Sequence, residues 1–189
     1  MKEDIKSKIV IAPLPVLILG TYDADGNPDA MNAAWGTQCG YEELSLLLDG
    51  GHKTTANIRL NKQFTVAIGT VDTLVMCDYF GIVSGNKIPD KIARAGATVV
   101  KGEHVNAPVI EQFPLTMECE VISIEDYDGD ARITARVVNV LADPSILNEH
   151  GKVDYGKLRP ITFDSETNTY RELGAVVGKA YHDGTAISK

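Results

Sequence analysis

The feature that most constrains the fold is a pair of alternating segments on either side of an Asp-Gly turn. Apolar and polar side chains alternate over Leu115–Val121, and the same alternation returns over Ala131–Val137. Asp128-Gly129 lies between the two segments, and this dipeptide favours the tight turns that join neighbouring antiparallel strands. The residues therefore predict a long β-hairpin over 115–141.

Both strands of this hairpin change phase along their length. Ile122 and Ile124 continue the first strand, and Val138 and Val140 continue the second, each pair out of phase with the residues beside it. Because strand side chains alternate between two faces, a phase change requires a bulge, a bend or a strand buried on both faces. Strongly bent strands suit a small closed barrel, so the pattern favours a barrel over a flat sheet.

The rest of the chain predicts a single domain, residues 1–189, built mainly from short strands. Hydrophobic residues make up 44% and charged residues 23% of the chain, as in ordinary globular proteins. No internal repeat or linker-like stretch divides it. Lengths and flanking turn residues predict strands at 15–22, 29–37, 44–49 and 64–69, a turn at 23–27, and helices at 54–61 and 71–80.

Charge and composition disfavour several classes of partner, although a local basic pocket for a phosphate stays possible. The net charge of −8 disfavours a general nucleic-acid surface or an anionic-membrane surface. No apolar stretch approaches the roughly 18 residues of a membrane span, and the N-terminal residues do not resemble a signal peptide. We therefore expect a cytoplasmic protein.

No CxxC pair is present, and Cys39, Cys77 and Cys119 are all expected to be small buried residues.

Familiar catalytic signatures are missing. The sequence contains no GxSxG, Walker A, GxGxxG or HExxH motif. Its four histidines lack metal-ligand spacing, and many of its carboxylates lie in turns. The sequence therefore predicts neither a catalytic triad nor a metal centre.

The first candidate binding segment is His52–Asn57, which follows Gly50-Gly51 and opens a predicted helix. A helix start exposes unpaired N–H groups and partial positive charge, so Lys53 with Thr54 and Thr55 would suit a phosphate. The alternative is ordinary capping, with a Thr as the cap and Lys53 in water. Spacing alone favours this alternative, because Thr caps are common.

Two further segments could contact a ligand. Asn32–Thr37 places small residues beside Trp35, the only tryptophan, so a planar ligand could approach the backbone while Asn and Thr bond its edge. A well-packed strand with a core Trp is the alternative. Ser84-Gly85 is followed by Asp90-Lys91. Taken alone, this is a loop entering a short helix, with Lys91 as a solvated cation.

Together these segments resemble the flavin-reductase-like family of FMN-binding split barrels, and its flavoredoxin branch in particular. The resemblance runs from Pro13 to Gly184. Its motifs are Asn-x-Ala-Trp-x-Thr, His-Lys-Thr-Thr-x-Asn-Ile, Asn-x-x-Phe-Thr-Val, Ser-Gly-(x)4-Asp-Lys, Ala-Pro-Val, Pro-Leu-Thr-Met-Glu-Cys, Tyr-Arg-Glu-Leu-Gly and Gly-Lys-Ala-Tyr-His-Asp-Gly. Each motif is weak alone, but their shared order is specific.

The resemblance implies an all-β-dominated fold: a six-stranded antiparallel Greek-key split barrel with peripheral helices. It also implies a homodimer with one FMN per subunit at the dimer interface. Carried over by position, Lys53, Thr54 and Thr55 would hold the phosphate, and Asn57 belongs to the same motif. Asn32, Trp35 and Thr37 would line the ring and ribityl chain, Ser84, Gly85 and Lys91 would approach the flavin, and Phe163 and Tyr181 would cover it, in part from the partner subunit.

The implied activity is oxidation of NADH or NADPH by FMN, with electrons passed to a flavin, a redox-protein partner or a metal complex. Lys53 and Lys91 would favour an anionic reduced flavin. A flavin performs the redox chemistry itself, so no catalytic base is expected. One alternative is an FMN-holding electron carrier without NAD(P)H activity. Another is a flavin- or haem-binding storage or sensor barrel. No nucleic acid or membrane partner is expected.

Overall fold

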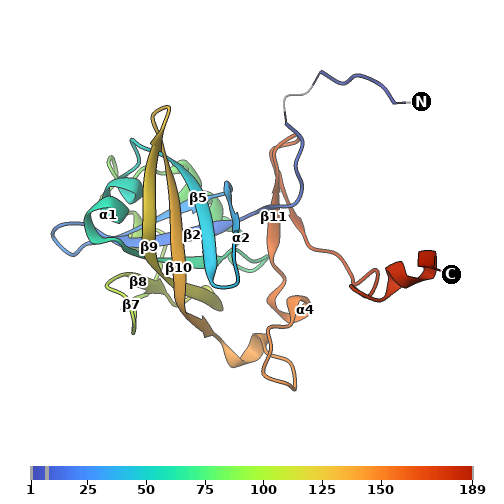
Figure 1. Ribbon diagram of the computed structural model, residues 1–189. Helices are drawn as coiled ribbons and strands as arrows, with labels where there is room; N and C mark the ends of the chain where they lie inside the picture. Colours follow the sequence, from blue (N-terminus) through green and yellow to red (C-terminus); the bar gives the residue numbers. More distant parts are fainter. Residues whose placement is uncertain (1, 7–8, 189) are drawn as a thin grey trace.

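The computed structural model describes residues 2–6 and 9–188, and its centre is a curled antiparallel sheet (Figure 1). The strands of this sheet lie in the order β3-β2-β6-β9-β10-β5-β4. Their bounds are β2 Leu17–Tyr22, β3 Pro28–Ala33, β4 Gly36–Gln38, β5 Glu43–Asp49, β6 Gln63–Ile68, β9 Leu115–Tyr127 and β10 Asp130–Ala142.

The two edge strands of the sheet, β3 and β4, are separated by only two residues. The opposite edges of the sheet must therefore lie close together, as in a barrel. β3 pairs with β2, and β4 pairs with β5 at the opposite edge. The sequence predicts one strand at 29–37, whereas the structure breaks it at Ala34 and Trp35. Counted as one strand, residues 28–38 make the barrel six-stranded, so the predicted split barrel is confirmed.

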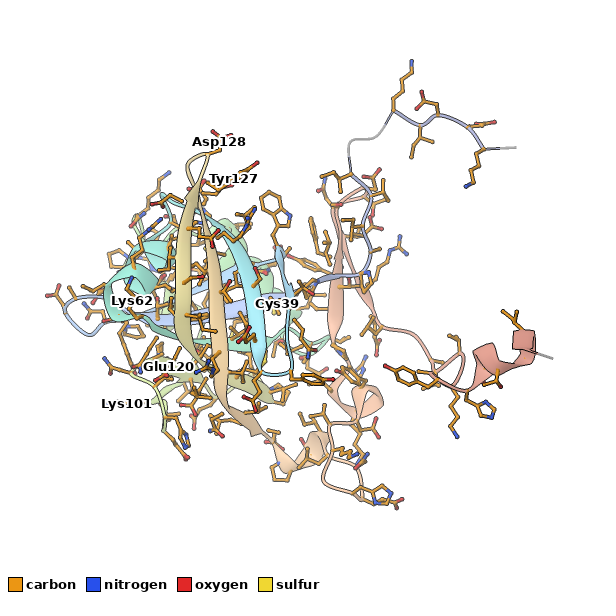
Figure 2. All side chains as sticks on the ribbon, viewed as in Figure 1. Cys39, Lys62, Lys101, Glu120, Tyr127 and Asp128 are labelled. Atoms are coloured by element: carbon orange, nitrogen blue, oxygen red, sulfur yellow. The ribbon has the colours of Figure 1, made fainter. Side chains whose placement is uncertain are left out.

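The predicted hairpin is confirmed as β9 and β10, including its turn and its phase changes. Asp128 and Gly129 both have positive φ (49° and 88°), as the tightest hairpin turns require, and Figure 2 shows Asp128 at the tip. The register of the pair shifts twice, which leaves Ile122 of β9 and Val138 of β10 without an opposite residue. Each strand thus carries one bulge. Bulges bend strands, which accounts for the curl.

The described residues also form the α-helices α1 Lys53–Asn61, α2 Leu74–Ile82, α3 Lys91–Arg94 and α4 Tyr155–Leu158, with 3-10 helices at Pro144–Ile146 and Asp183–Ser188. The predicted helix at 71–80 begins instead at Leu74. Thr70 and Thr73 bond one another through both backbone and side chain, so the residues between them form a turn.

The apolar core has two parts, one inside the barrel and one beneath α2. Ile58 of α1 packs with Leu19, Phe64 and Ile133 inside the barrel, and all four are fully buried. Ile18 and Phe80 belong to the second part, on the other face of β2. Each such side chain stabilises the fold by about 1.5–3 kcal/mol, so both faces of the central strands contribute.

Smaller sheets flank the barrel. β1 (Leu14–Pro15) pairs with β11 (Ile161–Asp164), which pairs with β12 (Thr169–Glu172); β7 (Val99–Lys101) pairs with β8 (Pro108–Ile110). The predicted strand at 15–22 is therefore divided between β1 and β2. Beyond β12 the chain runs away from the barrel to the C-terminus (Figure 1). Among the described residues, none of the helices is long and apolar enough to cross a membrane.

The cysteines only partly match expectation. Cys77 and Cys119 are buried as predicted, and burial raises the pKa of their thiols to about 11 and about 12. The prediction is wrong for Cys39, which is exposed. Cys39 follows the edge strand β4 in the turn that leads into β5, and its backbone N–H donates to the carbonyl of Glu43 at 2.9 Å.

Candidate functional site

A buried ion pair between β3 and α3 supports the candidate site. Lys91 Nζ lies 3.2 Å from Asp29 Oδ1, and both side chains are only 3% exposed. The same ammonium donates to the carbonyl of Val83 at 3.1 Å, and Thr54 Oγ1 donates to the other carboxylate oxygen of Asp29 at 2.8 Å. Reading Lys91 as a solvated cation is therefore wrong. Through these bonds the Lys91–Asp29 pair holds α3 and β3 against the residue that ends α2 and against the start of α1.

The start of α1 is not capped in the ordinary way. His52 occupies the cap position but makes no side-chain cap hydrogen bond. The hydroxyl of Thr54 binds Asp29, and that of Thr55 donates to the carbonyl of Asp49 at 2.8 Å. The capping alternative is thus wrong for both threonines. With their hydroxyls engaged inside the protein, what they present at the helix start is backbone N–H.

Lys53 lies at the same helix start and does not point freely into water. Its Nζ is 3.1 Å from Asp23 Oδ2, with each side chain 18% exposed. Burial opposes ionisation of Asp23, but the Asn27 backbone N–H and Lys53 together lower its pKa to about 2. The carboxylate is therefore charged at neutral pH. Asn57, one turn further along α1, is buried and donates to Thr21 at 3.0 Å.

The loop after α2 closes over this region at Gly85. A Cβ on Gly85 would lie 2.3 Å from Asp29 Oδ1 and 3.1 Å from the Lys53 side chain, so only glycine fits there. Ser84 accepts a hydrogen bond from the backbone of Asn86, and Asn86 donates to the carbonyl of Gly51 at 3.1 Å. The structure thus brings the predicted residues Ser84, Gly85 and Lys91 to the start of α1.

The predicted ring-lining residues lie on β3, the strand that carries Asp29, and on the chain that follows it to β4. Asn32 is half-buried and donates to the carbonyl of Cys77 in α2 at 3.0 Å. Trp35 is 64% exposed, so the alternative of a core Trp is wrong. Thr37, on the edge strand β4, is exposed as well. Trp35 and Thr37 therefore present open surface that the described part of the chain does not cover.

The two C-terminal residues predicted to cover a ligand have different surroundings. Phe163 lies on β11, packs against the second core and contacts Tyr170 in a tilted arrangement, with ring centroids 5.9 Å apart and an interplanar angle of 51°. Tyr181 is fully exposed in the C-terminal segment and lies outside both cores. The structure therefore brings Phe163 toward α2 but leaves Tyr181 apart from the other predicted residues.

Three residues of this region were not predicted as site residues. Asp23 and Asp29 carry the charges opposite Lys53 and Lys91, and Tyr170 donates to Asp78 of α2 at 2.9 Å. Burial and the Asp78 carboxylate raise the pKa of Tyr170 to about 12. The sequence around Asp23 predicts only a turn, and the sequence around Asp29 predicts only a strand. Neither local pattern reveals a distant lysine.

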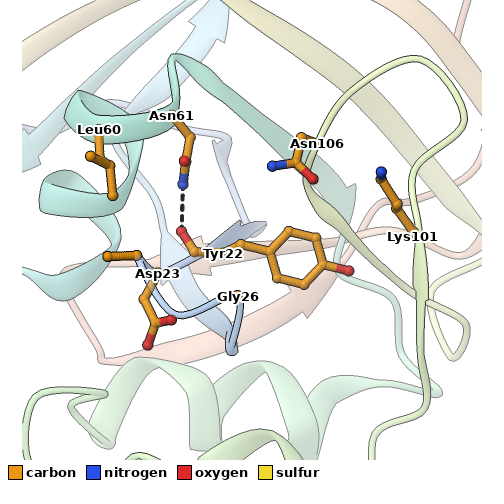
Figure 3. A pocket seen from close by; sticks show the side chains of 8 residues that line it. Tyr22, Asp23, Gly26, Leu60, Asn61, Lys101 and Asn106 are labelled. Atoms are coloured by element: carbon orange, nitrogen blue, oxygen red, sulfur yellow. Dashed lines mark hydrogen bonds between the residues drawn. The ribbon is translucent and has the colours of Figure 1, made fainter.

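One pocket of the single chain touches the site through Asp23, the partner of Lys53, and another is lined by residues outside the site. A cavity of about 530 Å³ is lined by Tyr22, Asp23, Ala24, Gly26, Leu60, Asn61, Lys101 and Asn106, and none of these is a predicted site residue (Figure 3). A second, of about 410 Å³, is lined by Tyr41, Glu42, Glu43 and Arg136. Within the described residues, no group of three His, Cys, Asp or Glu side chains could hold a metal.

Taken together, a curled six-stranded sheet with polar loops gathered at the start of α1 defines a protein of the split-barrel class. Residues 11–159 match the family model described as "Flavin reductase like domain". The chain belongs to this family.

Solved structures support this assignment. The flavoredoxin of Desulfovibrio vulgaris (Miyazaki F) is 31% identical, with a TM-score of 0.92 over 97% of this chain and all of that one. A flavoredoxin from Methanosarcina acetivorans is 25% identical, with a TM-score of 0.90 over 99% of each chain. Nitrilotriacetate monooxygenase component B from Bacillus cereus, 17% identical with a TM-score of 0.77 over 89% and 88%, shares the fold.

Among curated proteins, an uncharacterized protein of Aeropyrum pernix is 24% identical over 119 residues. The match spans 62% of this chain and 44% of that protein, so the chain covers less than half the length of this relative.

Proposed function

We propose that the chain binds FMN at the start of α1 and is an oxidoreductase that takes electrons from NADH or NADPH. The observation that carries the proposal is the arrangement at this helix. An uncapped N-terminus, a lysine and a glycine loop with no room for a Cβ lie together. Backbone N–H groups and an ammonium suit a phosphate, and the family assignment points to flavin.

The chain's own residues would bind and orient the cofactor. Lys53 and the backbone N–H groups of Thr54 and Thr55 would hold the phosphate. The buried Lys91–Asp29 pair positions the Gly85 loop beside it. Asn32 and Trp35 would line the ring. FMN, when bound, supplies the hydride and single-electron chemistry, and no residue of the chain needs to act as a catalytic base.

We further propose that the working form is a homodimer. Trp35 and Tyr181, both proposed to contact flavin, are exposed in the single chain. Val176 and Val177 in the C-terminal segment are also exposed. A second copy that covers these apolar side chains would complete the site, because exposed apolar patches mark interaction surfaces. One subunit alone would then present the flavin site as open surface rather than as an enclosed cavity.

The test is anaerobic mixing of the FMN-loaded protein with NADH and with NADPH. Rapid loss of the oxidised flavin absorbance with one or both supports the reductase. The acceptor is then sought among free flavins, redox proteins and metal complexes by the rate at which each restores the absorbance. Failure of the protein to bind FMN at all would reject the whole proposal.

A second function is favoured by the similarity to two flavoredoxins across nearly the full chain. In this alternative the protein is an electron carrier that holds FMN and is reduced by a partner protein. It predicts no bleaching with either nicotinamide but full bleaching with dithionite.

A further inference from the structure

The lysine proposed to bind the flavin phosphate already has an anionic partner. Lys53 Nζ lies 3.1 Å from Asp23 Oδ2, and both side chains are largely shielded from water. Lys91, the other lysine nearby, is paired with Asp29 in the same way. The two lysines are thus matched by two carboxylates, and an incoming phosphate meets a neutral cluster instead of two free positive charges.

Asp23 is the fixed member of its pair. The backbone N–H groups of Asp25 and Asn27 donate to Asp23 Oδ1 at 3.0 and 2.8 Å, and the Asn27 side chain donates to Oδ2 at 3.3 Å. These bonds hold the carboxylate in the β2–β3 turn. Lys53 is the movable member, because its ammonium sits on a flexible four-carbon stem with three donors.

We infer that Asp23 competes with the flavin phosphate for Lys53, and that this competition weakens the binding of phosphorylated flavin. The inference rests on the proposed function. A phosphate monoester carries about −1.5 to −2 charges at neutral pH, so it both attracts Lys53 and is repelled by Asp23. Binding therefore has to separate an existing ion pair.

The test compares Asp23→Asn with the native chain. Asparagine keeps the oxygen that accepts the two backbone N–H groups, so the turn is retained while the charge is lost. We expect the dissociation constant for FMN, measured by quenching of flavin fluorescence, to fall roughly two- to fivefold, the worth of one partly exposed ion pair. The constant for riboflavin, which lacks the phosphate, should not change.

Asp25→Asn is the matched control, since Asp25 is an exposed carboxylate in the same turn, and it should leave both constants unchanged. Lys53→Met provides the second control. In that background Asp23→Asn should no longer tighten FMN binding, because the group for which the two anions compete is gone. Asp23→Ser, which can also accept from the turn, serves if the Asn variant does not fold.

Four results would overturn the inference: unchanged FMN affinity in the folded Asp23 variant, equal tightening of riboflavin, equal tightening by Asp25→Asn, or tightening that persists with Lys53→Met. Failure of the proposed function is seen separately, as a native protein that quenches the fluorescence of neither flavin.

Discussion

Lys91 and Asp29 form an ion pair of 3.2 Å in which neither side chain is more than 3% exposed. A charge in such a place is tolerated only with its partner, because an unpaired buried ion is costly. Thr54 and the carbonyl of Val83 complete the set of hydrogen bonds. The pair therefore fixes α1, β3 and the loop after α2 around the proposed phosphate site.

Removing one member of this pair should strongly destabilise the protein. We expect Lys91→Met to lower the free energy of unfolding by about 3–5 kcal/mol, since Asp29 is left charged and buried. The matched control is Arg94→Met on the same helix. Arg94 pairs with Asp90 at 2.9 Å, but both side chains are more than half exposed, so its loss should cost less than about 1 kcal/mol. Urea unfolding measures both, and similar losses for the two variants would contradict the assignment.

A methyl group at position 85 should disturb the same region. In Gly85→Ala the new Cβ would meet Asp29 Oδ1 at 2.3 Å, so the loop or the carboxylate has to move. We expect a loss of stability of about 1–3 kcal/mol, typical of overpacking, together with weaker FMN binding. Gly174→Ala is the control, because nothing lies within 4 Å of its added Cβ, and both properties should there remain native.

Much of the fold follows from local patterns. The Asp128-Gly129 turn and the out-of-phase apolar residues Ile122 and Val138 predicted the hairpin and a phase change in each strand, because turn type and side-chain alternation are set by neighbouring residues. Of the three explanations left open for the phase change, the structure has the bulge. The division of residues 28–38 between two edges of the barrel was not predictable in this way. It depends on where β2 and β5 lie, and only the closed barrel determines that.

The site was predictable only in outline. The motifs predicted which segments meet, and the structure brings Ser84, Gly85 and Lys91 to the start of α1. The partners of the charged groups were not predicted, because Asp23 and Asp29 are distant in sequence from Lys53 and Lys91. Such pairs arise from tertiary contacts, which override the local preference of a turn aspartate or a surface lysine for water.

The raised pKa of Tyr170 predicts a dependence of stability on alkaline pH. Burial, and then the Asp78 carboxylate, raise this pKa from 10.0 to about 12 in the folded state. The folded protein therefore holds the phenol proton more tightly than the unfolded chain. The resulting stabilisation is complete below pH 10 and is lost as the pH rises from about 10 to about 12.

Tyr170→Phe removes this contribution. The stability of the native chain minus that of the variant should be constant at neutral pH and should shrink between about pH 10 and 12, as followed by urea unfolding at each pH. Tyr155→Phe is an exposed control, and its difference from the native chain should stay near zero throughout. A difference for Tyr170→Phe that does not change with pH would argue against a phenol held protonated by its surroundings.

Lys53 and Thr55 should separate in their effects on flavin binding, although both lie at the start of α1. The ammonium of Lys53 can turn to a phosphate, whereas the Thr55 hydroxyl is buried and donates to Asp49. We expect Lys53→Ala to weaken FMN binding by about 1–3 kcal/mol, the range for a hydrogen bond to a charged group, and to leave riboflavin binding unchanged. Thr55→Ala loses the bond to Asp49, so it should lower the free energy of unfolding by about 1–2 kcal/mol. It keeps its backbone N–H, so FMN affinity should change little.

Fluorescence titration measures FMN and riboflavin binding of both variants, and urea unfolding measures their stability. If Thr55→Ala weakened FMN binding as much as Lys53→Ala, the Thr55 side chain would have to leave Asp49 for the phosphate, and the backbone could not be its main contribution.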